Sequence, residues 1–195
     1  MNIATLLEAV TDAIGDREIL TCDGERRTYR QLEERANRLA HHLESIGVEP
    51  GAHVAIHMRN RIEYVEALLA CMKVRAVAIN VNYRFTESEL VHVYDNSQSV
   101  AVIVESDYLA PALSAIHRCP AVRHVLVLDS AAPTDLPRAD LTAAQYETAL
   151  SWQSPERDFG PRSDDDHFII YTGGTTGMPK GVVWRHEDFY YAALS

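Results

Sequence analysis

The sequence has little basic charge, few cysteines and no long apolar run. Its 195 residues carry 28 Asp and Glu against 18 Lys and Arg, for a formal net charge of −10. Binding to a nucleic-acid backbone needs clustered Lys and Arg, so this balance argues against nucleic acid as the main partner. No window approaches the roughly 18 consecutive apolar residues of a membrane-spanning helix, and the N-terminus lacks the basic and apolar segments of a signal peptide.

The chain also lacks a recognisable metal-ligand pattern. Cys22, Cys71 and Cys119 are widely spaced, without a CxxC pair or a zinc-type Cys/His spacing. This usage predicts reduced thiols in a cytoplasmic protein. The adjacent carboxylates of 164–166 lack a defined ligand geometry, so we interpret them as a solvated linker and predict no metal site.

What the sequence does contain is an alternation of helical and apolar segments. Capping boxes, in which a Ser, Thr or Asn is followed three residues later by Glu or Gln, predict three helix starts. They are Thr28 with Gln31, Asn60 with Glu63, and Thr86 with Glu89. Apolar runs at 53–58, 76–80, 100–104 and 124–128 suit strands covered on both faces. The predicted fold class is α/β, with a largely parallel sheet and flanking helices.

The second part of the chain is predicted to be less regular. Residues 129–166 are expected to form a loop-rich connection with one short helix over 142–150. Residues 168–185 are expected to form a strand–loop–strand unit, with strands at 168–171 and 181–184. We find neither an internal repeat nor a low-complexity tract.

The stretch YTGGTTGMPKGVVW, residues 171–184, holds the predicted functional site. Its glycines can adopt positive φ and turn successive N–H groups toward an anion, while its threonines and lysine add hydroxyl donors and a positive charge. A polyphosphate needs that many donors in a small space. The residues predicted to contact phosphate are Thr172, Gly173, Gly174, Thr175, Thr176, Gly177 and Lys180. The alternative is a flexible hairpin without a ligand. A Walker loop is excluded because Pro179 precedes the lysine and a strand-like run follows it.

This stretch resembles the phosphate-binding signature of the adenylate-forming superfamily, roughly Y-T-S-G-T-T-G-x-P-K-G-V. That superfamily includes acyl-CoA synthetases, adenylation domains of nonribosomal peptide synthetases and luciferases. Gly173 stands where serine is usual, which removes one hydroxyl and keeps a backbone N–H. The segment NVNYRFTESEL (80–90) is similar to a second family segment, and residues 27–97 look like the family's N-terminal subdomain. The overall appearance is nearest to actinobacterial fatty-acyl or steroid side-chain CoA ligases.

The resemblance implies a two-step reaction. A carboxylate attacks the α-phosphate of ATP, which is bound with Mg²⁺, and pyrophosphate leaves; the thiol of coenzyme A then displaces AMP. The loop would hold the β- and γ-phosphates. The resemblance also places His186 at the border of the acyl or nucleotide pocket, with a structural role at a helix start as the alternative. No residue of this chain is assigned as catalytic.

The resemblance covers residues 1–195 as the N-terminal part of an AMP-binding domain, and family members are more than twice as long. The later motifs for adenine, ribose, magnesium and coenzyme A, and the C-terminal domain, have no counterpart in this sequence. The expectation is therefore a chain that is inactive alone and self-associates through apolar surface. The alternatives are a non-catalytic binding module with a vestigial phosphate loop, a partner-dependent subunit of a split enzyme, and a nucleotide-binding regulator.

Overall fold

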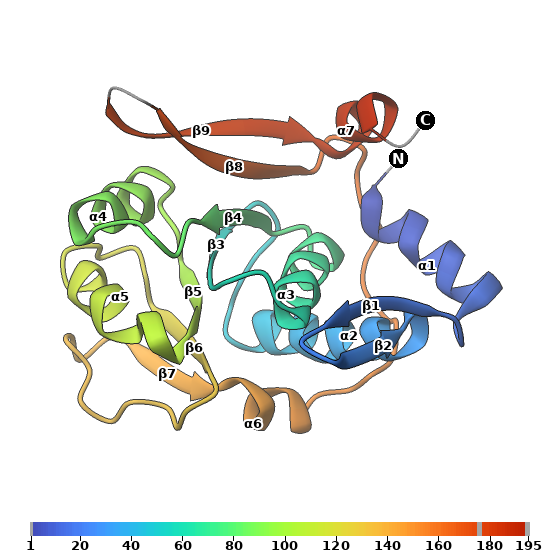
Figure 1. Ribbon diagram of the computed structural model, residues 1–195, viewed down its shortest axis with the longest axis horizontal. Helices are drawn as coiled ribbons and strands as arrows, with labels where there is room; N and C mark the ends of the chain where they lie inside the picture. Colours follow the sequence, from blue (N-terminus) through green and yellow to red (C-terminus); the bar gives the residue numbers. More distant parts are fainter. Residues whose placement is uncertain (1, 175–176, 194–195) are drawn as a thin grey trace.

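A central, mostly parallel sheet organises the chain, which a computed structural model describes over residues 2–174 and 177–193 (Figure 1). Within these residues seven strands form this sheet in the order β7–β6–β5–β3–β4–β8–β9, and every pair is parallel except β8 with β9. The strands are β3 (His53–His57), β4 (Val77–Val81), β5 (Ala101–Glu105), β6 (His124–Leu128), β7 (Thr142–Gln145), β8 (His167–Gly174) and β9 (Gly177–Arg185). The predicted α/β class with a largely parallel sheet is confirmed.

Helices cover both faces of the sheet (Figure 1). They are α1 (Ile3–Ile14), α2 (Tyr29–Ser45), α3 (Ile62–Lys73), α4 (Glu87–Asn96), the short η1 (Ser106–Tyr108), α5 (Leu109–Ile116), α6 (Tyr146–Ser151) and α7 (His186–Ala193). A small antiparallel pair, β1 (Glu18–Cys22) with β2 (Glu25–Thr28), leads into α2.

Successive side chains of one strand enter two different cores. Val54 and Ile56 of β3 pack with α1, α2, α3 and α6, whereas Ala55 packs with α4 and α5. A strand turns alternate side chains to opposite faces, so a strand buried on both faces must be apolar throughout. This is the physical reason that unbroken apolar runs, rather than alternating ones, predicted the parallel strands correctly.

Two of the three predicted helix starts are confirmed. The hydroxyl of Thr28 accepts from the N–H of Gln31, whose side chain accepts from the N–H of Thr28 at 2.9 Å. The N–H of Thr86 donates to the carboxylate of Glu89 at 2.7 Å.

The third predicted start, at Asn60, is wrong by one residue. Arg61 is the N-cap of α3 and makes no side-chain capping bond. Its guanidinium instead binds the carboxylate of Glu63, with Nε 2.7 Å from Oε2. The carboxylate that would complete a capping box with Asn60 is therefore held by the neighbouring arginine.

The helix expected over 142–150 is half right. Thr142–Gln145 form β7, which pairs in parallel with β6, and the helix begins only at Tyr146. An open sheet edge beside a short segment outweighs the weak helix preference of Thr-Ala-Ala-Gln. Residues 129–166 are thus less irregular than predicted.

Candidate phosphate-binding hairpin

The β8–β9 hairpin projects beyond the carboxyl edge of the parallel strands (Figure 1). β4 pairs with β8 only at Ile79↔Ile169 and Asn80↔Ile170. The next contact from β4 to β8 comes from a side chain instead of the backbone: Asn80 Oδ1 accepts from the N–H of Tyr171 at 2.6 Å. From Tyr171 onward β8 leaves the sheet and continues with β9 alone. Open parallel sheets bind ligands outside the carboxyl ends of their strands, which is where this hairpin lies.

The hairpin presents two chemically different faces. Thr172 pairs with Lys180, and the neighbouring rung pairs Tyr171 with Gly181. Directly opposed residues of an antiparallel pair share a face, and successive residues alternate. The Thr172 hydroxyl and the Lys180 ammonium therefore lie on one face, where both residues are exposed. The Tyr171 ring and Gly181 occupy the other face.

Gly181 allows the tyrosine ring to lie flat against the opposite strand. A Cβ at this position would meet Ile169 Cγ2 at 3.0 Å and Tyr171 Cζ at 3.1 Å, closer than side chains normally tolerate. The ring is held there from its far end, since the Tyr171 hydroxyl donates to Asn96 Oδ1 of α4 at 2.6 Å.

The strands run further into the predicted loop than the sequence indicated. The ladder continues through Thr172↔Lys180 to Gly174↔Gly177, so Gly173, Gly174, Gly177 and Lys180 belong to strands. Gly173 and Gly177 do not have the positive φ expected for an anion-binding nest, and open space surrounds both. Thr175 and Thr176 lie outside the described residues. The structure thus brings Thr172 and Lys180 together without a preformed nest at Gly173 or Gly177.

His186 lies at the opposite end of the hairpin from Thr172 and Lys180. It begins α7, is fully buried, and its Nδ1 accepts from the N–H of Ile3 at 3.2 Å. Burial lowers the pKa of this imidazole to about 4, so it is neutral at pH 7. Its ring also meets Phe168 edge-on, with the centroids 5.9 Å apart. These contacts tie α7 to the first turn of α1.

The base of the hairpin is fixed by an acidic side chain of the preceding segment. Asp166 accepts from Asn2 Nδ2 and from Arg75 Nε, both at 3.0 Å, and its carbonyl accepts from the N–H of His186. The interpretation of 164–166 as simply solvated is therefore wrong for Asp166, whose side chain is mostly buried. The partners lie 91 and 164 residues away in sequence, so local pattern could not reveal them.

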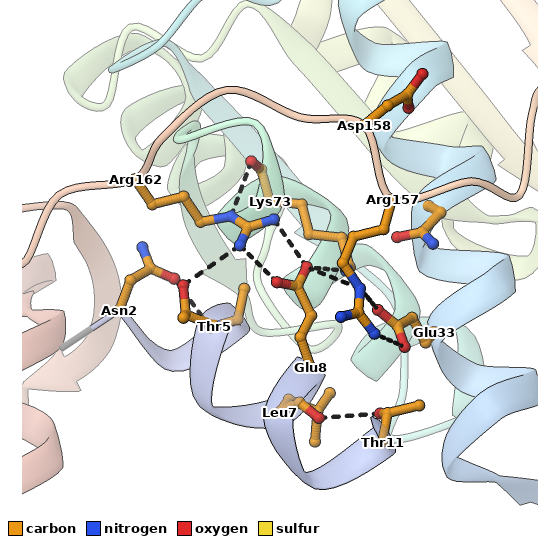
Figure 2. Close-up of polar contacts among 12 residues, drawn as sticks. Asn2, Thr5, Leu7, Glu8, Thr11, Glu33, Lys73, Arg157, Asp158 and Arg162 are labelled. Carbon is orange, nitrogen blue, oxygen red and sulfur yellow. Dashed lines mark hydrogen bonds and ion pairs between the residues drawn. The ribbon is translucent and has the colours of Figure 1, made fainter. Parts of the chain in front are cut away.

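A cluster of buried charges holds the linker, defined here as residues 152–166, against α1, α2 and α3. Figure 2 shows Arg157 and Arg162 reaching from the linker to Glu33 and Glu8. Arg162 contacts Glu8 through both terminal nitrogens at 2.8 Å, and Arg157 Nε lies 2.6 Å from Glu33 Oε1. Lys73, with its side chain 1% exposed, lies between the two glutamates. The linker leads directly into β8, so this cluster sets where the hairpin begins.

Across residues 2–174 and 177–193, no three His, Cys, Asp or Glu side chains gather closely enough to hold a metal ion. Over the same residues, no helix combines the length and the apolar character needed to cross a bilayer.

Comparison with known proteins agrees with this geometry. The sheet and the hairpin beyond its carboxyl edge define an N-terminal domain of the adenylate-forming class of enzymes. The model of the protein family described as "AMP-binding enzyme" matches residues 7–195, and the chain belongs to that family.

Two curated relatives and one solved structure illustrate the similarity. The chain is 50% identical over 190 residues to a 3-oxocholest-4-en-26-oate–CoA ligase of Rhodococcus rhodochrous, covering 97% of this chain and 34% of the ligase. It is 45% identical, with the same coverage, to a medium/long-chain-fatty-acid–CoA/3-oxocholest-4-en-26-oate–CoA ligase of Mycolicibacterium smegmatis. A fatty acyl CoA synthetase from Mycobacterium tuberculosis superposes with a TM-score of 0.75 at 26% identity, over 97% of this chain and 35% of that one. The chain thus spans about a third of the length of these relatives.

Proposed function

We propose that this chain is the phosphate-binding N-terminal part of an ATP-dependent carboxylate–CoA ligase. The observation that carries the proposal is the Thr172–Lys180 rung beyond the carboxyl edge of the sheet, in a chain so similar to a steroid-acid CoA ligase. The substrates of the complete ligase would be ATP, coenzyme A and a fatty or steroid side-chain acid. The free cysteines support a cytoplasmic location for it, because disulfides are rare in that compartment.

The chemistry assigned to the hairpin is charge stabilisation. In the first step a carboxylate oxygen attacks the α-phosphorus of ATP, the bond from that phosphorus to the bridging oxygen breaks, and pyrophosphate leaves with the electron pair. The Thr172 hydroxyl and the Lys180 ammonium would bind the departing phosphates, where negative charge accumulates. Mg²⁺, which supplies further positive charge, would arrive bound to ATP. In the second step the thiol of coenzyme A attacks the acyl carbonyl and AMP leaves.

We also propose that residues 1–195 do not catalyse adenylation alone. Among the described residues we assign hydrogen-bond donors to the phosphates, but we assign no residue to adenine, ribose or the acyl chain. A few phosphate contacts must offset the translational and rotational freedom that the nucleotide loses on binding, so nucleotide affinity is expected to be weak.

Carboxylate-dependent exchange of labelled pyrophosphate into ATP tests both parts of the proposal. We expect no exchange from residues 1–195 with a panel of fatty and steroid acids, and exchange from a hybrid in which they replace the matching segment of the Rhodococcus ligase. Combining Thr172→Val with Lys180→Ala in the hybrid should abolish most of that exchange. A folded hybrid that is inactive would contradict the assigned site, and exchange by the chain alone would contradict its dependence on further sequence.

The exposed edge of the sheet leads us to propose self-association. In the described part of the chain β9 has a strand partner on one side only, and Val182 and Val183 are 44% and 58% exposed. An open edge with apolar side chains is a template for pairing with another chain. Light scattering should show a mass that rises with concentration, and Val183→Lys should reduce it to the monomer. Trp152→Ser removes an apolar residue that is even more exposed, at 83%, but lies away from β9, and it should leave the rise unchanged. A monomer at all concentrations would contradict the proposal.

A further inference from the structure

One face of α4 contacts both strands of the β8–β9 hairpin. His92 Nε2 donates to the carbonyl oxygen of Pro179 in β9 at 2.9 Å, while Asn96 accepts from the Tyr171 hydroxyl of β8. Residues four apart in a helix lie on the same face, so a single surface of α4 reaches each strand once. Figure 1 shows α4 beside the outer part of the hairpin, away from α7.

The bond from His92 acts on the peptide that leads into Lys180. A peptide unit is planar, so holding the Pro179 carbonyl also fixes the nitrogen and Cα of Lys180, and thereby the point of the backbone from which the lysine side chain extends. A carbonyl oxygen can only accept a hydrogen bond, so Nε2 is the ring nitrogen of His92 that carries the donated hydrogen. Pro179 itself has a restricted φ, which limits the movement still available to this strand.

We infer that His92 is a positioning residue that orients Lys180 for polyphosphate, with Asn96 holding the opposite strand through Tyr171. This inference rests on the proposed function. His92 does not touch the phosphates; it acts through the backbone of Pro179.

Two substitutions at His92 separate the hydrogen bond from the ring. His92→Phe keeps an aromatic ring and removes the donor, whereas His92→Gln keeps an N–H that can reach the carbonyl. His117 offers a control, because its Nδ1 lies 3.2 Å from another proline carbonyl, that of Pro137, in the segment between β6 and β7. His117→Phe therefore removes the same kind of bond at a distance from the site.

Hydrogen exchange of the β9 amides is the first readout. In His92→Phe the amide hydrogens of Lys180 and Gly181 should exchange about fivefold faster, which is the change expected when one hydrogen bond no longer restrains local opening. His92→Gln should restore slow exchange, and His117→Phe should leave the hairpin unchanged. Equal protection in His92→Phe and the unsubstituted chain would overturn the inference, as would equal loss in His117→Phe.

Titration with inorganic tripolyphosphate is the second readout. His92→Phe should weaken binding by a similar factor, while its melting temperature stays close to that of His117→Phe. A lower melting temperature with unchanged tripolyphosphate affinity would reduce His92 to a purely structural role and overturn the inference. If the unsubstituted chain binds no tripolyphosphate, the proposed function fails, and the exchange data still decide whether His92 restrains the hairpin.

Discussion

Replacing Glu8 with glutamine is expected to cost about 3–5 kcal/mol of folding free energy, the typical effect of removing one partner from a buried ion pair. Glutamine has nearly the same shape but no charge, so among the described residues Glu33, at 3.3 Å, is the one carboxylate that still contacts Lys73. Arg162 keeps at most one of its two hydrogen bonds to this side chain, because an amide has a single acceptor oxygen. Urea denaturation followed by circular dichroism measures the change.

An exposed pair provides the control for this substitution. Glu18 contacts Arg26 at 2.8 Å, but the two side chains are 44% and 68% exposed. Exposed pairs contribute only about 0–1 kcal/mol, so Glu18→Gln should have little effect. Equal effects of Glu8→Gln and Glu18→Gln would contradict the assignment of the buried cluster as the element that holds the linker.

The cost of Glu8→Gln should depend on pH. Burial alone would raise the pKa of the Glu8 carboxyl, but the hydrogen bonds from Arg162 and Lys73 outweigh it and hold this pKa below its ordinary value of 4.5. A carboxyl whose pKa is lower in the folded state stabilises the fold above its unfolded-state pKa and loses that stabilisation as pH falls through the folded value. The two proteins should therefore differ fully at pH 7 and converge below pH 4.5. A difference that stays constant across this range would contradict the charge-based explanation.

The second large effect is expected at Gly181. The Cβ of Gly181→Ala would press on Ile169 and on the Tyr171 ring, and such overpacking costs about 1–3 kcal/mol. Because Tyr171 is held by Asn96, the opposite strand is expected to move, which disturbs the Thr172–Lys180 rung. Amide chemical shifts of the hairpin together with thermal melting detect both consequences.

Gly160→Ala is the matched control, since no atom lies within 4 Å of the added Cβ and its φ is not positive. Replacing such a glycine reduces the freedom of the unfolded chain and should be neutral or slightly stabilising. If Gly181→Ala were equally harmless, the packing of Tyr171 across Gly181 would not be needed to hold the hairpin.

Local sequence signals predicted the parts of the fold that depend on local physics. The apolar runs and the boxes at Thr28 and Thr86 report contacts within a few residues, and they placed β3 to β6, α2 and α4 closely. The helix start predicted at Asn60 was wrong because Arg61 competes for the carboxylate of Glu63. The helix predicted for residues 142–145 was wrong because strand β6 supplies the hydrogen bonds of this segment, which a local pattern does not show.

The candidate site likewise has a part that local sequence predicted and a part that depends on long-range contacts. The composition of 171–184 was sufficient to identify the polar hairpin, but the pairing of Thr172 with Lys180 required the register of two strands. The contacts from Asn80 and His92 join segments 91 and 87 residues apart, and those of Lys73 to Glu8 and Glu33 span 65 and 40 residues. Long-range hydrogen bonds and ion pairs of this kind leave no periodic trace in a sequence.

A titration of the isotopically labelled chain with ATP, followed by backbone amide chemical shifts, tests the central claim most directly. We predict saturable shifts of the hairpin amides, with Gly173 and Gly177 among the largest, a dissociation constant on the order of millimolar, and loss of these shifts in the Thr172→Val, Lys180→Ala double variant. Shifts confined to another part of the chain, or unchanged shifts in the double variant, would contradict the assignment of this hairpin as the phosphate site.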